Sequence, residues 1–270
     1  MTRATPLHHG RMPSTHEQSL SDTYEANDDF FDPVGARLVD LTDLRPGDRV
    51  LDLGCGRGAV LFAAVAAVGP DGYTVGVDLS PAVVRHTAAQ AARVGLRNVS
   101  VRVDDAEDLG FPDRSFEAVL ASFTLHLTPD PAAALAGAHR VLVPGGHFGL
   151  TTFGGDTGPA WQQAVQTLRG YAEPSLGGAR GRRPHPTPAD ELSRDPEAAL
   201  IRAGFTAVRT VEETTATAYP GPDAWWQSLR PLLEAIPPDH REEAREAAYA
   251  LIAPLAHHGR LIRYTTARRD

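Results

Sequence analysis

The stretch VLDLGCGRG at residues 50–58 places an aspartate and three alternating glycines directly after an apolar run. An apolar segment typical of a helix follows, from residue 59 to residue 68. This order predicts a strand, a tight glycine loop and a helix, because Gly54 and Gly56 permit a sharp turn and a close approach of a ligand to the backbone. In open parallel sheets such a loop lies at the carboxyl end of the first strand, where nucleotides bind.

The spacing of these glycines differs from that of a dinucleotide fingerprint. A pyrophosphate site usually has G-x-G-x-x-G, with a helix N-terminus directed at the phosphates. Here the order is D-x-G-x-G-x-G. The carboxylate of Asp52 would repel an anionic ligand and attract a cationic one. The loop alone leaves an NAD site and an ordinary glycine-rich turn open.

Acidic residues recur after the strands that follow. The segment 73–78 predicts a second strand that ends in Asp78, and an ionised carboxylate at such a position can accept hydrogen bonds from both ribose hydroxyls. The third strand, 99–103, leads to Asp105, which together with a backbone amide can recognise an adenine edge. Further strands are expected at residues 116–122, 147–153, 206–212 and 260–266.

Taken in order, VLDLGCGRG, VGVDLS, DDAEDLGFPDRSFEAVL and RVLVPGGHFGLTTF resemble the successive motifs of class I S-adenosylmethionine (SAM)-dependent methyltransferases. The group that the chain most resembles contains the small-molecule enzymes similar to ubiquinone/menaquinone methyltransferases, as found in bacterial natural-product pathways. The resemblance implies an α/β fold, a Rossmann-like doubly wound seven-stranded sheet whose last strand is antiparallel, with helical lid inserts. It also implies SAM as cofactor and S-adenosylhomocysteine (SAH) as product, with Asp78 on the ribose and Asp105 and Ala106 around the adenine. The predicted cofactor residues are Tyr24, Asp52, Gly54, Cys55, Gly56, Asp78, Leu79, Asp105, Ala106 and Ser122.

Composition limits the possible partners and compartment. The chain of 270 residues is 42% hydrophobic, enough for one sizeable core, and its apolar stretches are too short and interrupted for a membrane span. Residues 1–9 lack the apolar centre of a signal peptide, so a cytoplasmic location is expected. The net charge of −8 argues against nucleic-acid binding. The single cysteine, Cys55, excludes an internal disulfide and a multi-cysteine zinc site, and no residue spacing indicates a metal. We expect a small-molecule substrate and a monomer or homodimer.

Four regions are expected along the chain. Residues 1–21 are polar and predicted to be mobile, and residues 22–153 form the SAM-binding core. Residues 154–194 depart from the alternation of strands and helices, begin with a glycine-rich stretch that suggests a hinge, and are predicted to be a lid insert. Residues 195–270 complete the core and contain a helical insert at 222–257. Within these regions, an acid or serine before a proline marks helix starts at Ser80, Asp130 and Asp195.

Methyl transfer demands few catalytic residues, because the protein must mainly align donor and acceptor, exclude water and, where needed, remove a proton. His126 lies in the loop after the fourth strand and is the candidate base, with a role in shaping the pocket as the alternative. Aromatic and basic residues elsewhere are candidates for the substrate site, although each can equally be an ordinary packing or surface residue. These candidates are Phe31, Arg183, His185, Trp225 and Trp226.

The predicted function is SAM-dependent methyl transfer to a small-molecule acceptor. Amino-methylation of DNA bases is disfavoured, because Ser122-Phe123-Thr124-Leu125 stands in place of the [DNS]-P-P-[YFW] motif of the DNA amino-methyltransferases. A SAM-binding protein that catalyses a cyclisation or rearrangement would carry the same cofactor motifs. An NAD(P) oxidoreductase is the third possibility, and the glycine spacing and the Asp105-Ala106 pair disfavour it.

Overall fold

The computed structural model describes residues 28–157, 159–172, 188–217, 226, 233, 236–252 and 258–270. Its helices and strands are, in chain order, α2 (Asp28–Thr42), β1 (Arg49–Leu53), α3 (Ala59–Val68), β2 (Tyr73–Asp78), α4 (Pro81–Arg93), β3 (Val99–Val103), β4 (Phe116–Ser122), η1 (Leu125–Leu127), α5 (Pro131–Val141), β5 (Leu142–Thr157), α6 (Pro159–Ala172), α7 (Pro188–Arg194), α8 (Pro196–Arg202), β6 (Thr206–Thr217), η3 (Pro238–His240), α11 (Arg241–Ile252) and β7 (His258–Arg268). The predicted mobile segment 1–21 lies outside these described residues.

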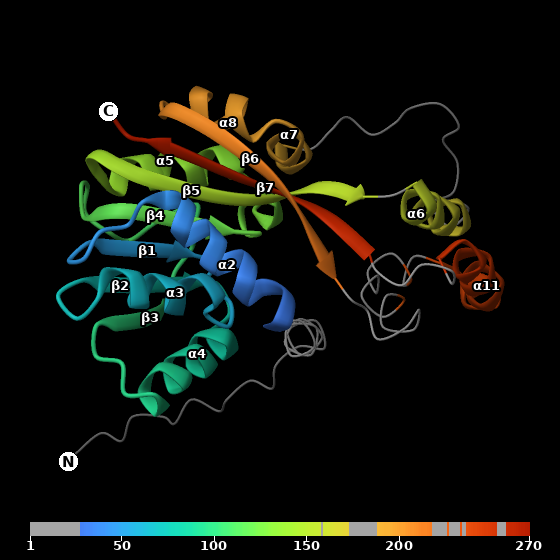
Figure 1. The fold of residues 1–270 in the computed structure, drawn as a ribbon, viewed down its shortest axis with the longest axis horizontal. Coiled ribbons are helices and arrows are strands. Elements are labelled where there is room, and N and C mark those ends of the chain that lie inside the picture. Colours follow the sequence, from blue (N-terminus) through green and yellow to red (C-terminus); the bar gives the residue numbers. More distant parts are fainter. Residues whose placement is uncertain are drawn as a thin grey trace, which may run out of the picture.

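In the described part of the chain, seven strands form one sheet in the order β3-β2-β1-β4-β5-β7-β6. Strands β1 to β5 pair in parallel, and β7 runs antiparallel to both β5 and β6. The parallel strands all point their carboxyl ends toward the same edge (Figure 1). The predicted α/β fold with a seven-stranded sheet and an antiparallel last strand is confirmed.

Helices cover both faces of the sheet. On one face, α2 and α3 bury Val34, Leu38, Val60 and Ala64 against β1 and β4. On the other, α5, α7 and α8 contribute to a second buried cluster with the inner residues of the central strands. Helix α4 packs along β3 and β2 at the sheet edge (Figure 1). Two such layers bury the apolar residues of a near-continuous hydrophobic run such as β1 on both sides.

The predicted helix starts have the geometry of side-chain caps. The Ser80 hydroxyl accepts from the backbone N–H of Val83 at 3.4 Å. The Asp130 carboxylate accepts from two backbone N–H groups at 3.1 Å, and the Asp195 carboxylate accepts from one at 3.0 Å. Each cap satisfies donors that the first turn of a helix leaves free, which fixes where α4, α5 and α8 begin.

The expected lid insert at 154–194 begins within strand β5 and ends with helix α7, and its role as a lid stays a prediction. The glycine-rich stretch lies in β5, which continues to Thr157 and pairs with β7 from His147 onward, with a register shift between Phe153 and Gly155. At the other end, α7 belongs to the core, since its Leu192 is 1% exposed and packs in the cluster under α5. The partner strand β7 supplies the hydrogen bonds that let an irregular glycine segment remain a strand.

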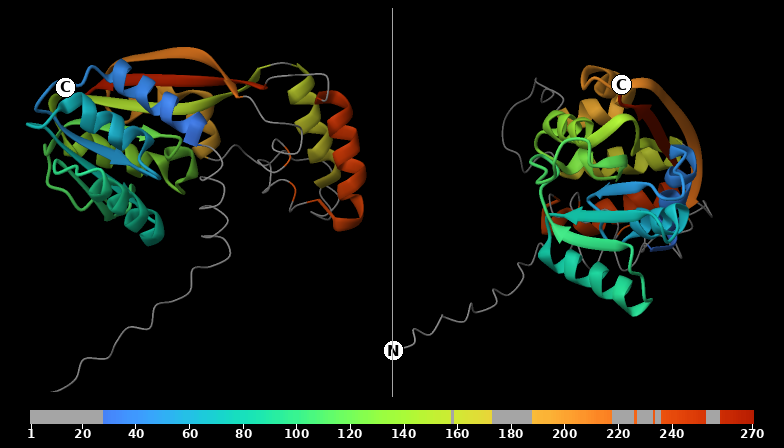
Figure 2. Two further views of the ribbon diagram at one scale, coloured as in Figure 1. Left: turned by 60° about the horizontal axis from the view of Figure 1, so that its bottom comes forward. Right: turned by 90° about the vertical axis from the view of Figure 1, so that its left-hand side faces the viewer.

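Helices α6 and α11 form a separate unit beyond the carboxyl ends of the parallel strands (Figures 1 and 2). Long extensions of β5, β6 and β7 connect it to the sheet. Its apolar cluster includes Ala164 and Leu168 of α6 and Ala244 and Ala248 of α11. None of the helices described here has both the length and the apolar character required to cross a membrane.

Candidate active site

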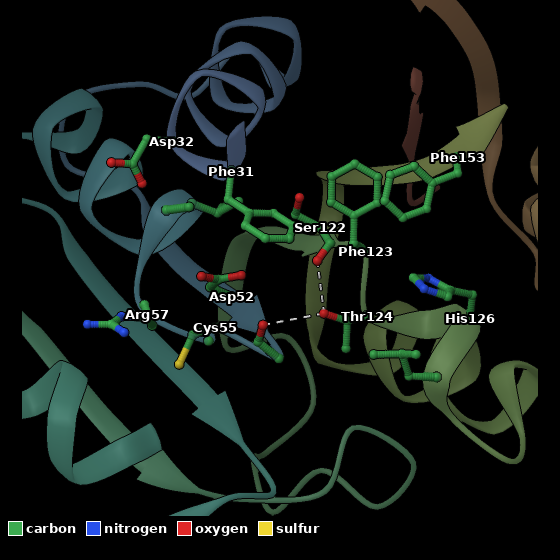
Figure 3. Close-up of a pocket in the computed structure, with 15 residues that line it drawn as sticks. Phe31, Asp32, Asp52, Cys55, Arg57, Ser122, Phe123, Thr124, His126 and Phe153 are labelled. Carbon is green, nitrogen blue, oxygen red and sulfur yellow. Dashed lines mark hydrogen bonds between the residues drawn. The ribbon is translucent and has the colours of Figure 1, made fainter. Parts of the chain in front are cut away.

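Two neighbouring cavities open where β1, β2 and β4 end. We call the first the aromatic cavity; it has a volume of about 210 Å³ and its wall contains three phenylalanine rings (Figure 3). We call the second the carboxylate cavity; it has a volume of about 360 Å³ and its wall contains four acidic residues. Gly54, Thr124 and Leu127 line both. The two cavities therefore meet at the contact between the glycine loop and the end of β4.

The glycine loop has the backbone that its sequence predicted. Gly54, Gly56 and Gly58 have φ of +64°, +50° and +97°, a region that side chains disfavour. A Cβ atom at Gly54 would lie 2.3 Å from Cγ2 of Thr124. Glycine is therefore required at position 54 both by the turn and by the close approach of Thr124.

Asp78 connects the glycine loop to the end of β2. One carboxylate oxygen accepts from the backbone N–H of Gly56 at 3.1 Å, and the other accepts from that of Ser80 at 2.9 Å. Burial raises the pKa of Asp78, and these two hydrogen bonds partly oppose that rise. An ionised carboxylate has about four acceptor positions, so two remain for a ligand in the carboxylate cavity.

Asp52 is a buried carboxylate in the wall of the aromatic cavity. Its side chain is 1% exposed, and its Oδ2 atom has no hydrogen-bond partner in the structure. Burial, together with the negative charge of Asp78, raises the pKa of Asp52 well above its usual value. Because an unpaired buried carboxylate oxygen is unfavourable, this atom is placed to accept from a ligand donor, best of all a cationic one.

The carboxylate cavity is shaped by a short loop after β3. The carboxylate of Asp104 accepts from the backbone N–H of Asp105 at 3.1 Å and pairs with Arg102 at 2.6 Å. Asp105 in turn accepts from the backbone N–H of Glu107 at 2.9 Å. These bonds hold Asp105 and Ala106 opposite Asp78, so the acids that the sequence placed after two separate strands line one cavity.

The aromatic cavity has an apolar side and one imidazole (Figure 3). The rings of Phe123 and Phe153 stack with centroids 4.2 Å apart, and Phe31 meets Phe123 edge-on at 5.9 Å. His126, in η1, faces Phe153 at 6.1 Å. Burial lowers the pKa of His126, so the imidazole is neutral at neutral pH and can accept a proton.

Most of the predicted site residues lie in these two walls. The aromatic cavity contains Phe31, Asp52, Cys55, Gly56, Ser122 and His126, the carboxylate cavity contains Asp78, Leu79, Asp105 and Ala106, and Gly54 belongs to both. Burial raises the pKa of the Cys55 thiol, which keeps it protonated. The predictions for Tyr24, Arg183, His185 and Trp225 fall outside the described residues.

Trp226, predicted as a substrate residue, lies in the α6–α11 unit, and its role in acceptor binding stays a prediction. Its ring meets Tyr249 of α11 edge-on at 6.0 Å, and it packs against the apolar cluster of the α6–α11 unit. It lines neither of the two cavities described above.

Sequence reasoning missed several residues of the walls. Phe123 directly follows β4, and Phe153 lies in the carboxyl-terminal half of β5. The rule that ligands bind at the carboxyl ends of parallel strands could have identified both. Asp104 and Glu107 flank the predicted Asp105. Thr124 had no sequence signal, because its importance comes from its contact with Gly54, 70 positions earlier in the chain.

Comparison with known proteins gives a consistent result. The family described as "Methyltransferase domain" matches residues 44–186. Nocamycin O-methyltransferase of Saccharothrix syringae is 40% identical over 82% of this chain and 84% of its own length. Aklanonic acid methyltransferase DauC of a Streptomyces species is 43% identical over 50% of this chain and 62% of its own length.

Among solved structures, YcgJ of Bacillus subtilis has the same fold, with a TM-score of 0.60 and 20% identity over 88% of this chain and 99% of that protein. The matched family segment contains the glycine loop, every residue of the carboxylate cavity, and the aromatic cavity except Phe31 and Asp32. From the family match, the relatives and the fold together, we conclude that this chain belongs to the class I SAM-dependent methyltransferases.

Proposed function

We propose that this protein transfers the methyl group of SAM to an oxygen atom of a small, ring-containing natural product. The observation that carries the proposal is the pair of cavities that meet at Gly54 and Thr124, one with carboxylates and one with aromatic rings and a neutral imidazole. A relative with 40% identity is named as an O-methyltransferase of nocamycin, and a second is named for aklanonic acid.

The residues of the walls fit SAM. Asp78 has acceptor positions left for ribose hydroxyls, and the loop at Asp105 and Ala106 would hold the adenine. The orphaned oxygen of Asp52 would accept from the ammonium group of the methionine moiety. When bound, SAM supplies an electrophilic methyl group on a sulfonium centre.

The aromatic cavity would hold the acceptor. The stacked rings of Phe123 and Phe153 offer a flat apolar surface to a planar ring, and Phe31 closes the side of the cavity. His126 would take the proton from an acceptor hydroxyl, for which a neutral imidazole is suited. We further propose that the α6–α11 unit acts as a lid, because it lies beyond the carboxyl ends of the strands, as Figure 1 shows.

The test is product analysis. Purified protein is incubated with SAM and a panel of acceptors: aklanonic acid, planar phenols, and the corresponding compounds without a free hydroxyl. Mass spectrometry should find SAH together with an acceptor heavier by one CH2 unit, since a methyl group replaces the hydroxyl proton, with fragmentation placing the methyl on oxygen. A product isomeric with its substrate and no SAH would instead support the cyclisation alternative.

Asp78→Ala is expected to weaken SAM binding by about 1–3 kcal/mol, because hydrogen bonds to a charged, part-buried acceptor are lost. The glycine loop also loses the bond from Gly56 in this variant, whereas Asp78→Asn retains one acceptor oxygen and should lie between the two. Calorimetric titration with SAH measures the effect. Asp71→Ala, which removes an exposed acid at the turn before β2, is the control and should bind normally. Equal affinity for Asp78→Ala and wild type would mean that the ribose lies elsewhere.

Cofactor binding should release a proton from Asp52. Burial raises the pKa of Asp52 in the free protein, so the carboxyl is protonated at pH values below that raised pKa, and a ligand ammonium group favours the ionised form. SAH affinity should therefore increase as pH rises toward that pKa, and should level off above it. Below about pH 7 the ligand amino group stays protonated and does not contribute.

Calorimetry in buffers of different ionisation enthalpy measures this proton release. The observed binding enthalpy should vary with the buffer for the wild type and should not vary for Asp52→Asn. A wild-type enthalpy that is independent of the buffer at pH values where SAH affinity still rises with pH would contradict the assignment of Asp52 to the ammonium group.

A further inference from the structure

The wall of the aromatic cavity includes a residue in an unfavourable backbone conformation. Phe123, the first residue after β4, has φ of +50°, a region that non-glycine residues rarely adopt. Its side chain is buried, stacked on Phe153 and in contact with Phe30 and Phe31 at 5.9 Å. Such a conformation persists only where neighbouring groups determine it, so the groups that hold Phe123 matter.

The backbone N–H of Phe123 has its hydrogen-bond partners on Thr151, in the middle of β5. The backbone N–H of Phe123 donates to the Thr151 hydroxyl at 3.1 Å and to the Thr151 carbonyl at 3.3 Å. The same hydroxyl lies 2.8 Å from the hydroxyl of Ser122. Thr151 has no exposed surface, and it lines neither cavity. Its hydroxyl therefore acts on both residues at the end of β4 without touching a ligand.

The residue after Phe123 forms the boundary between the two cavities. The Thr124 hydroxyl donates to the carbonyl oxygens of Ser122 at 3.1 Å and Gly54 at 3.3 Å, as the dashed lines in Figure 3 show. Because Thr124 directly follows Phe123, a change in the backbone angle of Phe123 would move Thr124 away from the glycine loop. The backbone conformation of Phe123 thus fixes the position of its own ring in the aromatic cavity and the position of Thr124 beside the glycine loop.

We propose that Thr151 is a positioning residue: its hydroxyl keeps Phe123 in the left-handed conformation, and thereby places the Phe123 ring and the Thr124 side chain for binding. The part of this inference that concerns ligand binding rests on the proposed use of the two cavities. The part that concerns the backbone of Phe123 does not depend on it.

The experiment compares three variants. Thr151→Val removes the hydroxyl and keeps the shape, and Thr151→Ser keeps the hydroxyl. Thr152→Val makes the same change one residue along β5, where the Thr152 hydroxyl is buried and has no hydrogen-bond partner in the structure. Each variant is crystallised without ligand, its thermal midpoint is measured, and SAH is titrated by calorimetry.

Thr151→Val should show Phe123 outside the left-handed region and SAH affinity lower by about three- to tenfold, the range for one lost hydrogen bond. Thr151→Ser should retain wild-type geometry and affinity. Thr152→Val should bind SAH normally, whatever its thermal midpoint. Unchanged Phe123 geometry in Thr151→Val would overturn the proposal, and so would an affinity loss of equal size in Thr152→Val. Absence of SAH binding by the wild type would contradict the proposed function instead, and the crystal structures would still decide the role of Thr151.

Discussion

Gly54→Val is expected to abolish cofactor binding while leaving the protein folded. A side chain at position 54 is unfavourable for two reasons: φ is +64°, and a Cβ atom would lie 2.3 Å from the Thr124 side chain. The added side chain forces Thr124 out of the boundary between the two cavities. We expect SAH affinity to fall by about 100-fold or more, which corresponds to about 3 kcal/mol. Calorimetric titration measures the loss, and far-ultraviolet circular dichroism checks the fold.

Gly95→Val separates the steric effect from backbone strain. Gly95 has φ of +75°, and a Cβ atom there would meet nothing within 4 Å. This variant should be destabilised by about 1–3 kcal/mol, the scale of a left-handed non-glycine residue, and should bind SAH like the wild type. If Gly54→Val and Gly95→Val bind equally well, the glycine loop is not the cofactor cradle.

His126→Ala is expected to lower turnover by about 10²–10⁴-fold, the usual contribution of a positioned general base, with SAH affinity nearly unchanged. The measurement is the rate of SAH formation with whichever acceptor of the panel is methylated. The wild-type rate should rise with pH up to the pKa of His126 and then level off, because the neutral imidazole is the active form. Since burial lowers that pKa, the ascending limb should lie below about pH 6.5.

The shape of the pH profile separates catalysis from positioning. Removal of a base eliminates the ascending limb, whereas loss of packing against Phe153 lowers the rate and keeps the limb. His126→Gln, which retains a polar side chain of similar size, serves as the second variant and should be as slow as His126→Ala. A variant with near-wild-type turnover would indicate that alignment of donor and acceptor is sufficient, as for an acceptor that is already nucleophilic.

The features that the sequence predicted well are those with a local cause. The turn at Gly54 and Gly56 and the helix start at Ser80 follow from the backbone preferences and side-chain bonds of neighbouring residues. The meeting of Asp78 and Asp105 in one cavity follows from a general rule, because both follow the carboxyl ends of adjacent parallel strands.

The features that escaped prediction depend on residues distant in the chain. The Thr124 hydroxyl donates to the carbonyl oxygen of Gly54 in the glycine loop. The Thr151 hydroxyl, on β5, accepts from the backbone N–H of Phe123 at the end of the neighbouring strand β4. The continuation of β5 through Gly154 depends on pairing with β7, more than 100 positions later, against the local tendency of glycine to end a strand. Such contacts exist only in the folded chain.

The ribbon made by the ends of β5, β6 and β7 separates two hydrophobic cores (Figure 2). In the described residues, the cluster between α6 and α11 shares no member with the clusters that pack against the sheet. Substitutions in distant, unconnected sites generally have additive effects on stability. Substitutions in α6 and α11 should therefore leave the two cavities at the glycine loop unchanged, and these helices can be exchanged between relatives by joining the chains within the ends of β5, β6 and β7.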